Sequence, residues 1–249
     1  MAGEADRLVG SERVLAVLKE LAEHPDGVSL DELAQRIGGS KPTLHRALAA
    51  LRRAGLASQT ARGVYELGDE FVRLALRFQA ARPEGIRVEP VLRELAETFG
   101  ETAHYAVLDG LEVVYRAKID PPLGSVRLSS EIGGRNPAWC TAVGKVMASQ
   151  FVRTRAQLDS WLGASRLEPR TEHSIVDRDA LLAELDRTRE RGYGLDDQES
   201  DLGVNCVAIA VPSPTGALAA VSVSALAYRR DLAQLERDVP RIREIIAKL

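Results

Sequence analysis

The chain has 249 residues, 45% of them hydrophobic and 4% aromatic, and its 33 Lys and Arg against 36 Asp and Glu give a net charge of −3. This length allows two domains with apolar cores of Leu, Val, Ala and Ile. The composition excludes a secretory, a membrane-spanning and a disulfide-stabilised protein: the N-terminus carries acidic residues, no run approaches the roughly 20 apolar residues of a membrane span, and there are only two cysteines, Cys140 and Cys206. We therefore expect a cytoplasmic protein with no membrane partner.

Residues 11–67 predict a first domain, after a disordered lead-in at 1–10. Its first helix covers 11–24, with an apolar side of Val14, Leu15, Leu18 and Leu21. A turn, Pro25-Asp26-Gly27, leads to a short second helix in which Ser29 and Glu32 have the spacing of a capping box. Leu30, Leu33 and Ile37 are the apolar residues of that helix.

A third helix follows over residues 40–56, SKPTLHRALAALRRAGL. Ser40 can accept hydrogen bonds from the first free N–H groups, Pro42 fits a first turn, and Gly55 ends the helix. One side carries the apolar stripe Leu44, Ala47, Leu48 and Leu51. The other side carries Pro42, Arg46, Ala49 and Arg53, flanked by Thr43, His45 and Ala50. Short side chains permit close approach and arginines bind phosphates and guanine edges, so this side fits a DNA major groove.

Residues 56–67 predict a β-hairpin around Ala61, Arg62 and Gly63, which completes a winged helix-turn-helix. From Arg36 to Arg62 the chain has six basic and no acidic residues, although the rest of it sums to −9. Such a basic stretch is typical of a polyanion-binding surface, whereas an ordinary solvated helix would mix both signs. The predicted DNA-binding residues are Ser40, Lys41, Pro42, Thr43, His45, Arg46, Arg52, Arg53 and Arg62. Among them Thr43, His45 and Arg46 are expected at base edges, and Lys41, Arg52, Arg53 and Arg62 at phosphates.

Residues 68–85 predict a linker helix with Phe71, Leu74 and Phe78 on one side. The second domain or a second copy of the chain must bury that side. The second domain, 86–249, starts with a helix at 86–99 that turns Leu92, Leu95 and Phe99 inward. Two strands follow within 102–119, joined at Asp109-Gly110.

The sequence of the rest of the second domain predicts further strands before and after a series of helices. We expect a strand at 125–130, a loop at 131–140, helices at 141–151, 154–162 and 177–192, and an acidic loop at 192–203. Strands at 205–213 and 217–226 follow, joined by Pro214-Thr215-Gly216. The last helix has Leu232, Leu235, Val239, Ile242, Ile246 and Leu249 on one side, and Pro240 must kink or divide it. This order fits an α+β domain on a largely antiparallel sheet.

Two segments of the second domain have the composition of a small-ligand pocket. The glycine-containing stretch 133–145 runs into a helix with Thr141 as its N-cap, and the first-turn N–H groups of Ala142, Val143 and Gly144 attract anions such as carboxylates. The second segment, 196–206, is an acidic loop entering a strand. Asp196, Cys206, Ser222 and Ser224 are polar where apolar residues would otherwise dominate. The alternative is that no ligand binds here. In that case Thr141 only caps a helix, the glycines only form turns, and Cys206 is a small core residue.

The order of these segments resembles the IclR family of bacterial transcriptional regulators over about 10–248. The most specific motifs are Pro-(x)3-Thr-Ala-x-Gly-Lys at 137–145 and Asp-x-x-Glu-(x)3-Gly-x-x-Cys at 196–206. The resemblance implies a winged helix that binds palindromic operators, and a C-terminal domain, related to GAF-like sensor folds, that binds a small, often carboxylate-bearing metabolite. It also implies a homodimer or homotetramer.

The resemblance further implies which positions bind the effector. Backbone N–H groups of Ala142 and Val143 would contact it, together with Asp196, Val204, Cys206, Ser222 and Ser224, and the pocket would be lined by Ser125, Leu128 and Asn136. Asn136 departs from the family, whose members often have an apolar residue there, and the bulky Trp139 lies nearby. The identity of the metabolite, the target genes, and repression or activation stay open.

An enzyme is the main competing class. A Cys–His pair of Cys206 with His104 or His173 is conceivable, but no nucleophile-elbow glycines surround either cysteine, and single buried cysteines are usually inert. The cysteines and histidines have no close-paired spacing for a metal. A protein-interaction or small-molecule-binding module without DNA would not need the arginine-rich helix. We expect no catalytic residues, no metal and no cofactor.

Overall fold

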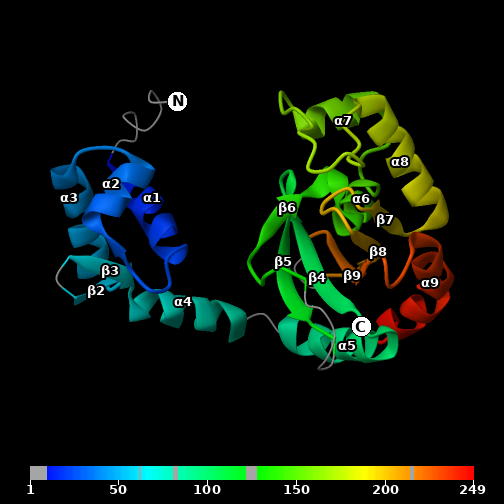
Figure 1. Cartoon of the computed structure of the whole chain (residues 1–249), viewed down its shortest axis with the longest axis horizontal. Helices are drawn as coiled ribbons and strands as arrows, with labels where there is room; N and C mark the ends of the chain where they lie inside the picture. The colour runs from blue at the N-terminus through cyan, green and yellow to red at the C-terminus, as the bar shows by residue number, and fades with distance from the viewer. Residues whose placement is uncertain (1–9, 62, 81–83, 122–127, 214–215) are drawn as a thin grey trace. The chain divides into compact units, whose positions relative to one another are not determined.

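The computed structural model describes every residue except 1–9, 62, 81–83, 122–127 and 214–215. The chain forms two compact units, Met1–Arg82 and Pro83–Leu249, each described by itself below (Figure 1). Nearly all of the predicted lead-in, and the joining turn at 214–215, lie outside the described residues. Across the described part of the chain, no helix has both the length and the apolar character that a membrane span requires.

The N-terminal unit is the predicted winged helix-turn-helix. Its elements are α1 (Ser11–Ala22), β1 (Val28–Ser29), α2 (Leu30–Ile37), α3 (Lys41–Arg53), β2 (Ala57–Ala61), β3 (Val64–Leu67) and α4 (Asp69–Ala80). The three strands form an antiparallel sheet in the order β1-β3-β2. Leu44, Leu48 and Leu51 of α3 are buried against Val17 and Leu21 of α1, so the apolar stripe predicted for α3 is confirmed.

Three details of this unit differ from the prediction. Leu15 is 58% exposed, and Val17 takes its place in the core, because Val14, Val17, Leu18 and Leu21 share one side of α1 at helical spacing. The two-residue strand β1 was not predicted, since only its pairing with β3 defines it. Ser40 is the N-cap residue of α3, but its side chain makes no capping hydrogen bond, and its Oγ lies 2.8 Å from Thr43 Oγ1 instead.

The C-terminal unit is built on one six-stranded antiparallel sheet in the order β6-β5-β4-β9-β8-β7. Its strands are β4 (Thr102–Asp109), β5 (Glu112–Ile119), β6 (Arg135–Pro137), β7 (Gly194–Asp197), β8 (Val204–Val211) and β9 (Ala219–Leu226). Its helices are α5 (Glu84–Phe99), the 3-10 helix η2 (Ala138–Cys140), α6 (Ala142–Ala148), α7 (Arg155–Leu162), α8 (Arg178–Arg191) and α9 (Leu232–Ile246). The predicted α+β class with an antiparallel sheet is confirmed.

Helices cover both faces of this sheet (Figure 1). On one face, α5 and α9 pack on Tyr105, Val207 and Val221 in the largest apolar core. On the other face, α6 packs on Ala106, Ala208 and Ala220, and the small side chains of the sheet let it approach closely. Behind α6, α7 and α8 form a further apolar cluster that includes Trp139 and Cys140.

Several loop predictions in this unit were wrong. The expected loop at 131–140 contains β6 and η2, and the expected acidic loop at 192–203 contains β7. Both strands are defined by pairing with β5 and β8, which local sequence does not reveal. Of the strand expected at 125–130, only 128–130 are described, and they are not in a strand. Pro240 does not divide α9, because buried Leu235, Val239, Ile242 and Ile246 hold the helix to the core on both sides of it.

Candidate functional site

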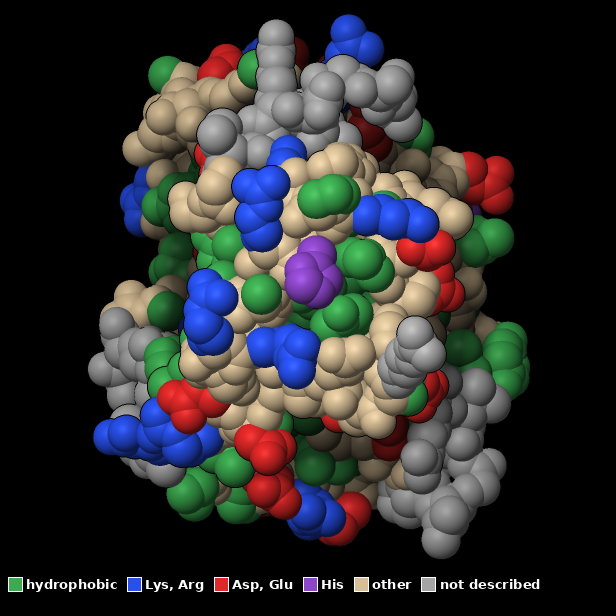
Figure 2. Space-filling view, turned by 90° about the vertical axis from the view of Figure 1, so that its left-hand side faces the viewer, with side chains coloured by type: hydrophobic (Ala, Val, Ile, Leu, Met, Phe, Trp, Pro, Cys, Tyr) green, Lys and Arg blue, Asp and Glu red, His purple; other side chains and the backbone are tan. Residues whose placement is uncertain are grey.

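The solvent-facing side of α3 is the candidate nucleic-acid interface. Lys41, Pro42, His45, Arg46, Arg52 and Arg53 are all exposed, and Thr43, Ala49 and Ala50 are half-buried. Figure 2 views the molecule from this side and shows Lys and Arg side chains arranged around a histidine and small hydrophobic groups. Ser40 lies at the start of the helix, and Arg62 lies outside the described residues.

The two ends of α3 fix this side toward solvent. Pro42 stands in the first turn, where its missing N–H leaves no helical bond unmade. At the other end, Leu56 N donates to Leu51 O at 2.9 Å and Gly55 N donates to Arg52 O at 3.1 Å, which is a Schellman motif. Gly55 has a φ of 72°, which favours glycine. The chain therefore leaves α3 sharply into β2, and the arginines of the last turn stay exposed.

The charge of this surface is less uniform than the sequence window implies. Lys41 Nζ lies 2.8 Å from Asp31 Oδ1, and Arg36 Nη1 lies 3.6 Å from Glu20 Oε1. Acidic residues that precede the basic stretch 36–62 in sequence therefore contact its basic side chains. Lys41, Asp31 and Arg36 are exposed and Glu20 is half-buried, so water screens both pairs and they contribute little to stability. Within the described residues, no acidic side chain pairs with Arg46, Arg52 or Arg53. These three guanidinium groups remain available to a polyanion.

A row of polar side chains crosses the C-terminal sheet on the face that α6 covers. Register pairs Asp196 with Cys206, Cys206 with Ser224, and Ser222 with His104. Directly paired residues share a face of the sheet, and so do residues two apart on one strand. The sheet therefore brings four predicted effector residues together, namely Asp196, Cys206, Ser222 and Ser224. We call them, with His104, the polar sheet face.

The first turn of α6 lies against the β7 end of this face. Thr141 is the N-cap, and its Oγ1 accepts a hydrogen bond from Gly144 N at 3.2 Å. A Cβ on Gly194 of β7 would stand 2.2 Å from Ala142 O, and a Cβ on Gly144 would stand 2.1 Å from Ala138 O. Both glycines permit backbone approaches that no other residue allows. Ala142 and Val143 are consequently buried beside the polar row at the positive end of a helix.

Asp196 holds the loop that follows β7. Its Oδ1 accepts from Glu199 N at 2.7 Å and Ser200 N at 3.3 Å, and its Oδ2 accepts from Ser200 Oγ at 2.5 Å. Burial raises the pKa of the Asp196 carboxyl, while these hydrogen bonds and the charge of Lys145 act in the opposite direction. Lys145 on α6 forms a buried ion pair with Glu199. Loop and helix are thus joined by groups that are nearly inaccessible to water.

Sequence reasoning did not assign three side chains of this region to the site: the buried His104 and Tyr115, and the half-buried Lys118. His104 Nε2 lies 2.8 Å from Ser130 Oγ, and its ring lies 4.9 Å from the Tyr115 ring. Lys118 Nζ donates to the carbonyls of Leu128 and Ser130 at 2.8 and 2.7 Å. The signal was present as polar residues alternating along β4 and β5, but their convergence with Ser222 and Ser224 depends on strand pairing.

The remaining predicted effector residues take varied positions. Asn136 on β6 is half-buried and donates to the Tyr115 hydroxyl at 3.3 Å. Val204 starts β8 and is half-buried, as is Leu128. Ser125 lies outside the described residues. Trp139 packs with α7 and α8 rather than on the polar sheet face.

The cysteines lack the character of nucleophiles or metal ligands. Burial raises the pKa of the Cys140 thiol to about 12 and raises that of Cys206 as well. A thiol reacts as its thiolate, so both groups are held in the unreactive form. The part of the chain that the structure describes contains no group of three or more His, Cys, Asp and Glu side chains placed to hold a metal ion.

Comparison with known proteins agrees with both halves of this description. Residues 11–61 match the model of the IclR helix-turn-helix domain, and residues 85–249 match that of the bacterial transcriptional regulator IclR C-terminal domain. The chain is 34% identical over 226 residues to the HTH-type transcriptional regulator XynR of Escherichia coli, covering 90% of this chain and 88% of XynR.

Solved structures share the whole fold. An IclR transcriptional regulator from Alicyclobacillus acidocaldarius has a TM-score of 0.78 at 25% identity, covering 96% of each chain. An IclR homologue from Microbacterium hydrocarbonoxydans, solved in complex with 4-hydroxybenzoate, has a TM-score of 0.76 at 19% identity, covering 95% of this chain and 98% of that one.

Proposed function

The chain belongs to the IclR family of bacterial transcriptional regulators, with a helix-turn-helix DNA-binding domain and an effector-binding C-terminal domain, and from this premise we propose how it reads DNA and what it senses. A dimer places two copies of α3 in successive major grooves of a palindromic operator, about 34 Å apart. The observation that carries this proposal is the exposed side of α3, where unpaired arginines surround short side chains.

Roles follow from position along α3. Thr43, His45 and Arg46 stand in the first turns, where a recognition helix meets base edges, and they read sequence. Lys41, Arg52 and Arg53 bind phosphates and set affinity and register. On binding DNA, Lys41 leaves Asp31 and pairs with a phosphate. The loss of the Lys41–Asp31 ion pair costs little free energy because both side chains are exposed. Arg62, which follows β2 in the sequence, is proposed for the same role on the sequence alone.

The effector is a small organic acid bound between the first turn of α6 and the polar sheet face. The N–H groups of Ala142 and Val143 supply an anion-binding helix terminus. Ser222, Ser224 and Cys206 supply neutral polar contacts, with Asp196 holding the neighbouring loop. Val204, Leu128, Asn136 and Ser125 complete the lining in this proposal. A carboxylate is favoured because the positive end of the α6 helix lies beside this row, and the charges of Lys145 and Lys118 also reach it.

The regulator works as a homodimer or homotetramer in the cytoplasm and has no catalytic activity. Exposed apolar residues of α4, including Phe71, Leu74 and Phe78, are 37 to 55% exposed within one chain, and a second copy covers them. The raised pKa values of both thiols argue against a cysteine nucleophile. Effector binding changes operator affinity by favouring one arrangement of the paired DNA-binding domains, a coupling of about 1–3 kcal/mol.

The decisive experiment is selection of genomic fragments by the purified protein near physiological salt, followed by sequencing of the retained DNA. A short palindrome upstream of a catabolic operon is the expected result, and the substrate of that operon nominates the effector. Retention without sequence preference would leave only the electrostatic contribution to binding and would contradict base reading by α3. No retention even at low salt would favour an interaction module over a DNA-binding protein.

A further inference from the structure

Tyr115 brings a phenol hydroxyl to the polar sheet face from β5. It pairs with Ala106 of β4, which lies two residues from His104, so Tyr115 and His104 share the face of the sheet that α6 covers. Their rings lie 4.9 Å apart. We propose that Tyr115 and Asn136 determine the specificity of the effector site, by selecting a carboxylic acid that also carries a hydroxyl group, an inference that rests on the proposed function.

Asn136 leaves the Tyr115 hydroxyl with an unused proton. Asn136 pairs with Val113, two residues from Tyr115 on β5, and its Nδ2 donates to the Tyr115 hydroxyl oxygen at 3.3 Å. Within the described residues, no group accepts the proton of that hydroxyl. In the opposite orientation of the amide, the hydroxyl donates to Asn136 Oδ1, and the amide N–H groups are unused instead. The pair therefore presents a free hydrogen-bond donor in either orientation.

This free donor lies in the interior, close to the effector residues. Tyr115 is only 9% exposed. Burial raises the pKa of its hydroxyl, the Asn136 hydrogen bond lowers it, and negative charge on Cys206 or Asp196 raises it again. The hydroxyl is thus near enough to Cys206 and Asp196 for their charge to act on it, and it stays protonated at physiological pH. A buried donor without an acceptor is unfavourable, so a ligand that supplies an acceptor here gains affinity.

A hydroxyl group on the ligand matches this pair best. It accepts from the Tyr115 hydroxyl and can donate to Asn136 Oδ1, whereas a methyl group leaves both unpaired. A second carboxylate would add a buried negative charge beside Asp196, whose pKa is already raised by burial. The carboxylate of the same ligand binds the first-turn N–H groups of Ala142 and Val143. The site is therefore selective for hydroxy acids over the corresponding unsubstituted acids.

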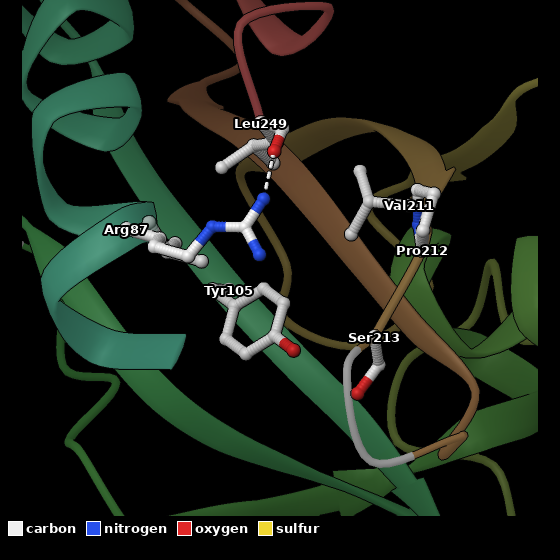
Figure 3. Close-up of a pocket in the computed structure, with 7 residues that line it drawn as sticks. Arg87, Tyr105, Val211, Pro212, Ser213 and Leu249 are labelled. Carbon is white, nitrogen blue, oxygen red and sulfur yellow. Dashed lines mark hydrogen bonds between the residues drawn. The ribbon is translucent and has the colours of Figure 1, made fainter. Parts of the chain in front are cut away.

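The cavity on the opposite face of the sheet differs, because its polar side chains are already engaged. It has a volume of about 220 Å³ and lies where Arg87 of α5 approaches Tyr105 and Leu249 (Figure 3). Arg87 Nη2 donates to the main-chain oxygen of Leu249 at 2.5 Å. Tyr105 and Ser213 also have partners. The polar sheet face is therefore the better candidate for a ligand with two polar groups.

Calorimetric titration of the full chain tests this selectivity with matched acids. Benzoate is compared with its meta- and para-hydroxy derivatives, and propionate with lactate, so that the hydroxyl stands at different distances from the carboxylate. In at least one comparison the hydroxy acid should bind about tenfold more tightly than the unsubstituted acid, as expected for one additional buried hydrogen bond. Equal binding in every comparison would overturn the selectivity and leave the effector site itself standing. Binding of none of these acids would overturn both.

Two variants assign the selectivity to the pair. Tyr115→Phe removes only the hydroxyl, so the preference for the hydroxy acid should disappear while the affinity for the unsubstituted acid stays unchanged. Asn136→Leu keeps the Tyr115 hydroxyl but removes its amide partner, and should reduce the preference several-fold. The hydroxyl of Tyr193 donates to Glu236 at 3.0 Å outside the effector site, so Tyr193→Phe is the matched control and should keep the wild-type preference. An unchanged preference in Tyr115→Phe, or an equal loss of affinity for both kinds of acid, would overturn the proposal.

Discussion

Nδ1 of His104 lies 3.4 Å from Oγ of Ser224, across the β4–β9 pair at the centre of the polar sheet face. The other ring nitrogen lies 2.8 Å from Ser130 Oγ. Burial, and to a smaller extent the charge of Lys118, lower the pKa of His104 to about 3 against the opposing charge of Asp120. The imidazole is therefore neutral at physiological pH. It can both donate and accept a hydrogen bond among hydroxyl groups.

The first prediction is a pH dependence of stability that arises from His104. The ring takes up a proton near pH 6.5 in the unfolded chain but only near pH 3 in the folded chain, so the unfolded state binds more protons between these values. From His104 alone the free energy of unfolding should consequently fall by about 2 kcal/mol between pH 6.5 and pH 5, whereas the raised pKa of Glu199 contributes in the opposite direction, so the comparison with a His104 variant isolates this group. Urea denaturation at several pH values measures the slope.

His104→Gln should remove this contribution to the slope while retaining hydrogen-bonding capacity. The exposed His173→Gln is the matched control and should keep the wild-type slope. If His104→Gln has the same dependence of stability on pH as the wild type, then His104 is not the residue responsible; the buried carboxyl groups of Asp196 and Glu199 would not explain a loss on acidification, because their raised pKa values act in the opposite direction.

The second prediction concerns the ion pair between Lys145 and Glu199. Their side chains are only 1% and 8% exposed, and burial raises the pKa of Glu199 to about 7 in spite of the lysine. Replacing one member leaves the other charge buried without its partner. Glu199→Gln should therefore lower the free energy of unfolding by roughly 3 kcal/mol at pH 8. Lys145→Met/Glu199→Met should cost less than the sum of the two single changes, as a double-mutant cycle would show.

The exposed pair of Lys248 with Glu94, at 2.6 Å, provides the comparison for that cycle. Lys248→Met should cost less than about 1 kcal/mol, because water screens the pair and solvates the remaining carboxylate. Equal losses at the two sites would mean that Glu199 is solvated in solution.

The third prediction assigns Asp196 to the ligand response. Asp196→Ala removes the acceptor for Glu199 N, Ser200 N and Ser200 Oγ, so the loop beside the polar sheet face loses its anchor. The effector, once identified from the target operon, should then no longer alter operator affinity, while DNA binding without it stays intact. Calorimetric titration with effector and anisotropy with operator measure the two properties. The exposed Asp197→Ala is the matched control, and joint loss of both properties would make Asp196 a purely structural residue.

Local signals in the sequence predicted much of this fold. The capping box of Ser29 and Glu32 is present with both of its hydrogen bonds, and Asp177 caps α8, because such motifs involve residues three apart. Gly55 and Gly192 end their helices with positive φ, as expected. The apolar stripe of α3 was equally predictable from helical spacing.

The polar sheet face was predictable only in part. Ser222 and Ser224 could be placed on one side of a strand from their spacing, but their neighbours on β4 come from a strand more than 100 residues earlier in the chain. The sequence offers His104 as a partner of a cysteine nucleophile or as a metal ligand, since nothing near it in sequence indicates a hydroxyl-lined site. Strands β6 and β7 were missed for the same reason, because hydrogen bonds to distant strands stabilise them.

The fourth prediction tests the role of α4 in self-association. Leu74 is 47% exposed within one chain, beside other exposed apolar residues of the helix. Leu74→Glu should weaken the dimer by placing a charge in its interface, shifting the sedimentation profile toward monomer at micromolar concentration. Ile132→Glu changes a residue that is 62% exposed in the C-terminal unit and should leave the profile unchanged. An unaltered dimer in Leu74→Glu would exclude this face of α4 from the interface.

The fifth prediction separates base reading from phosphate binding on α3. Arg46 is exposed in the second turn and Arg53 in the last, and neither has an acidic partner among the described residues. Arg46→Ala should weaken operator binding by roughly 1–3 kcal/mol and relax specificity at one base pair. Arg53→Ala should weaken binding to every sequence alike and reduce the slope of log affinity against log salt by about 1. Anisotropy titrations against single-base variants of the operator, at several salt concentrations, measure both. If Arg46→Ala weakens all sequences equally, Arg46 binds phosphate, and base reading must come from Thr43, His45 or the wing.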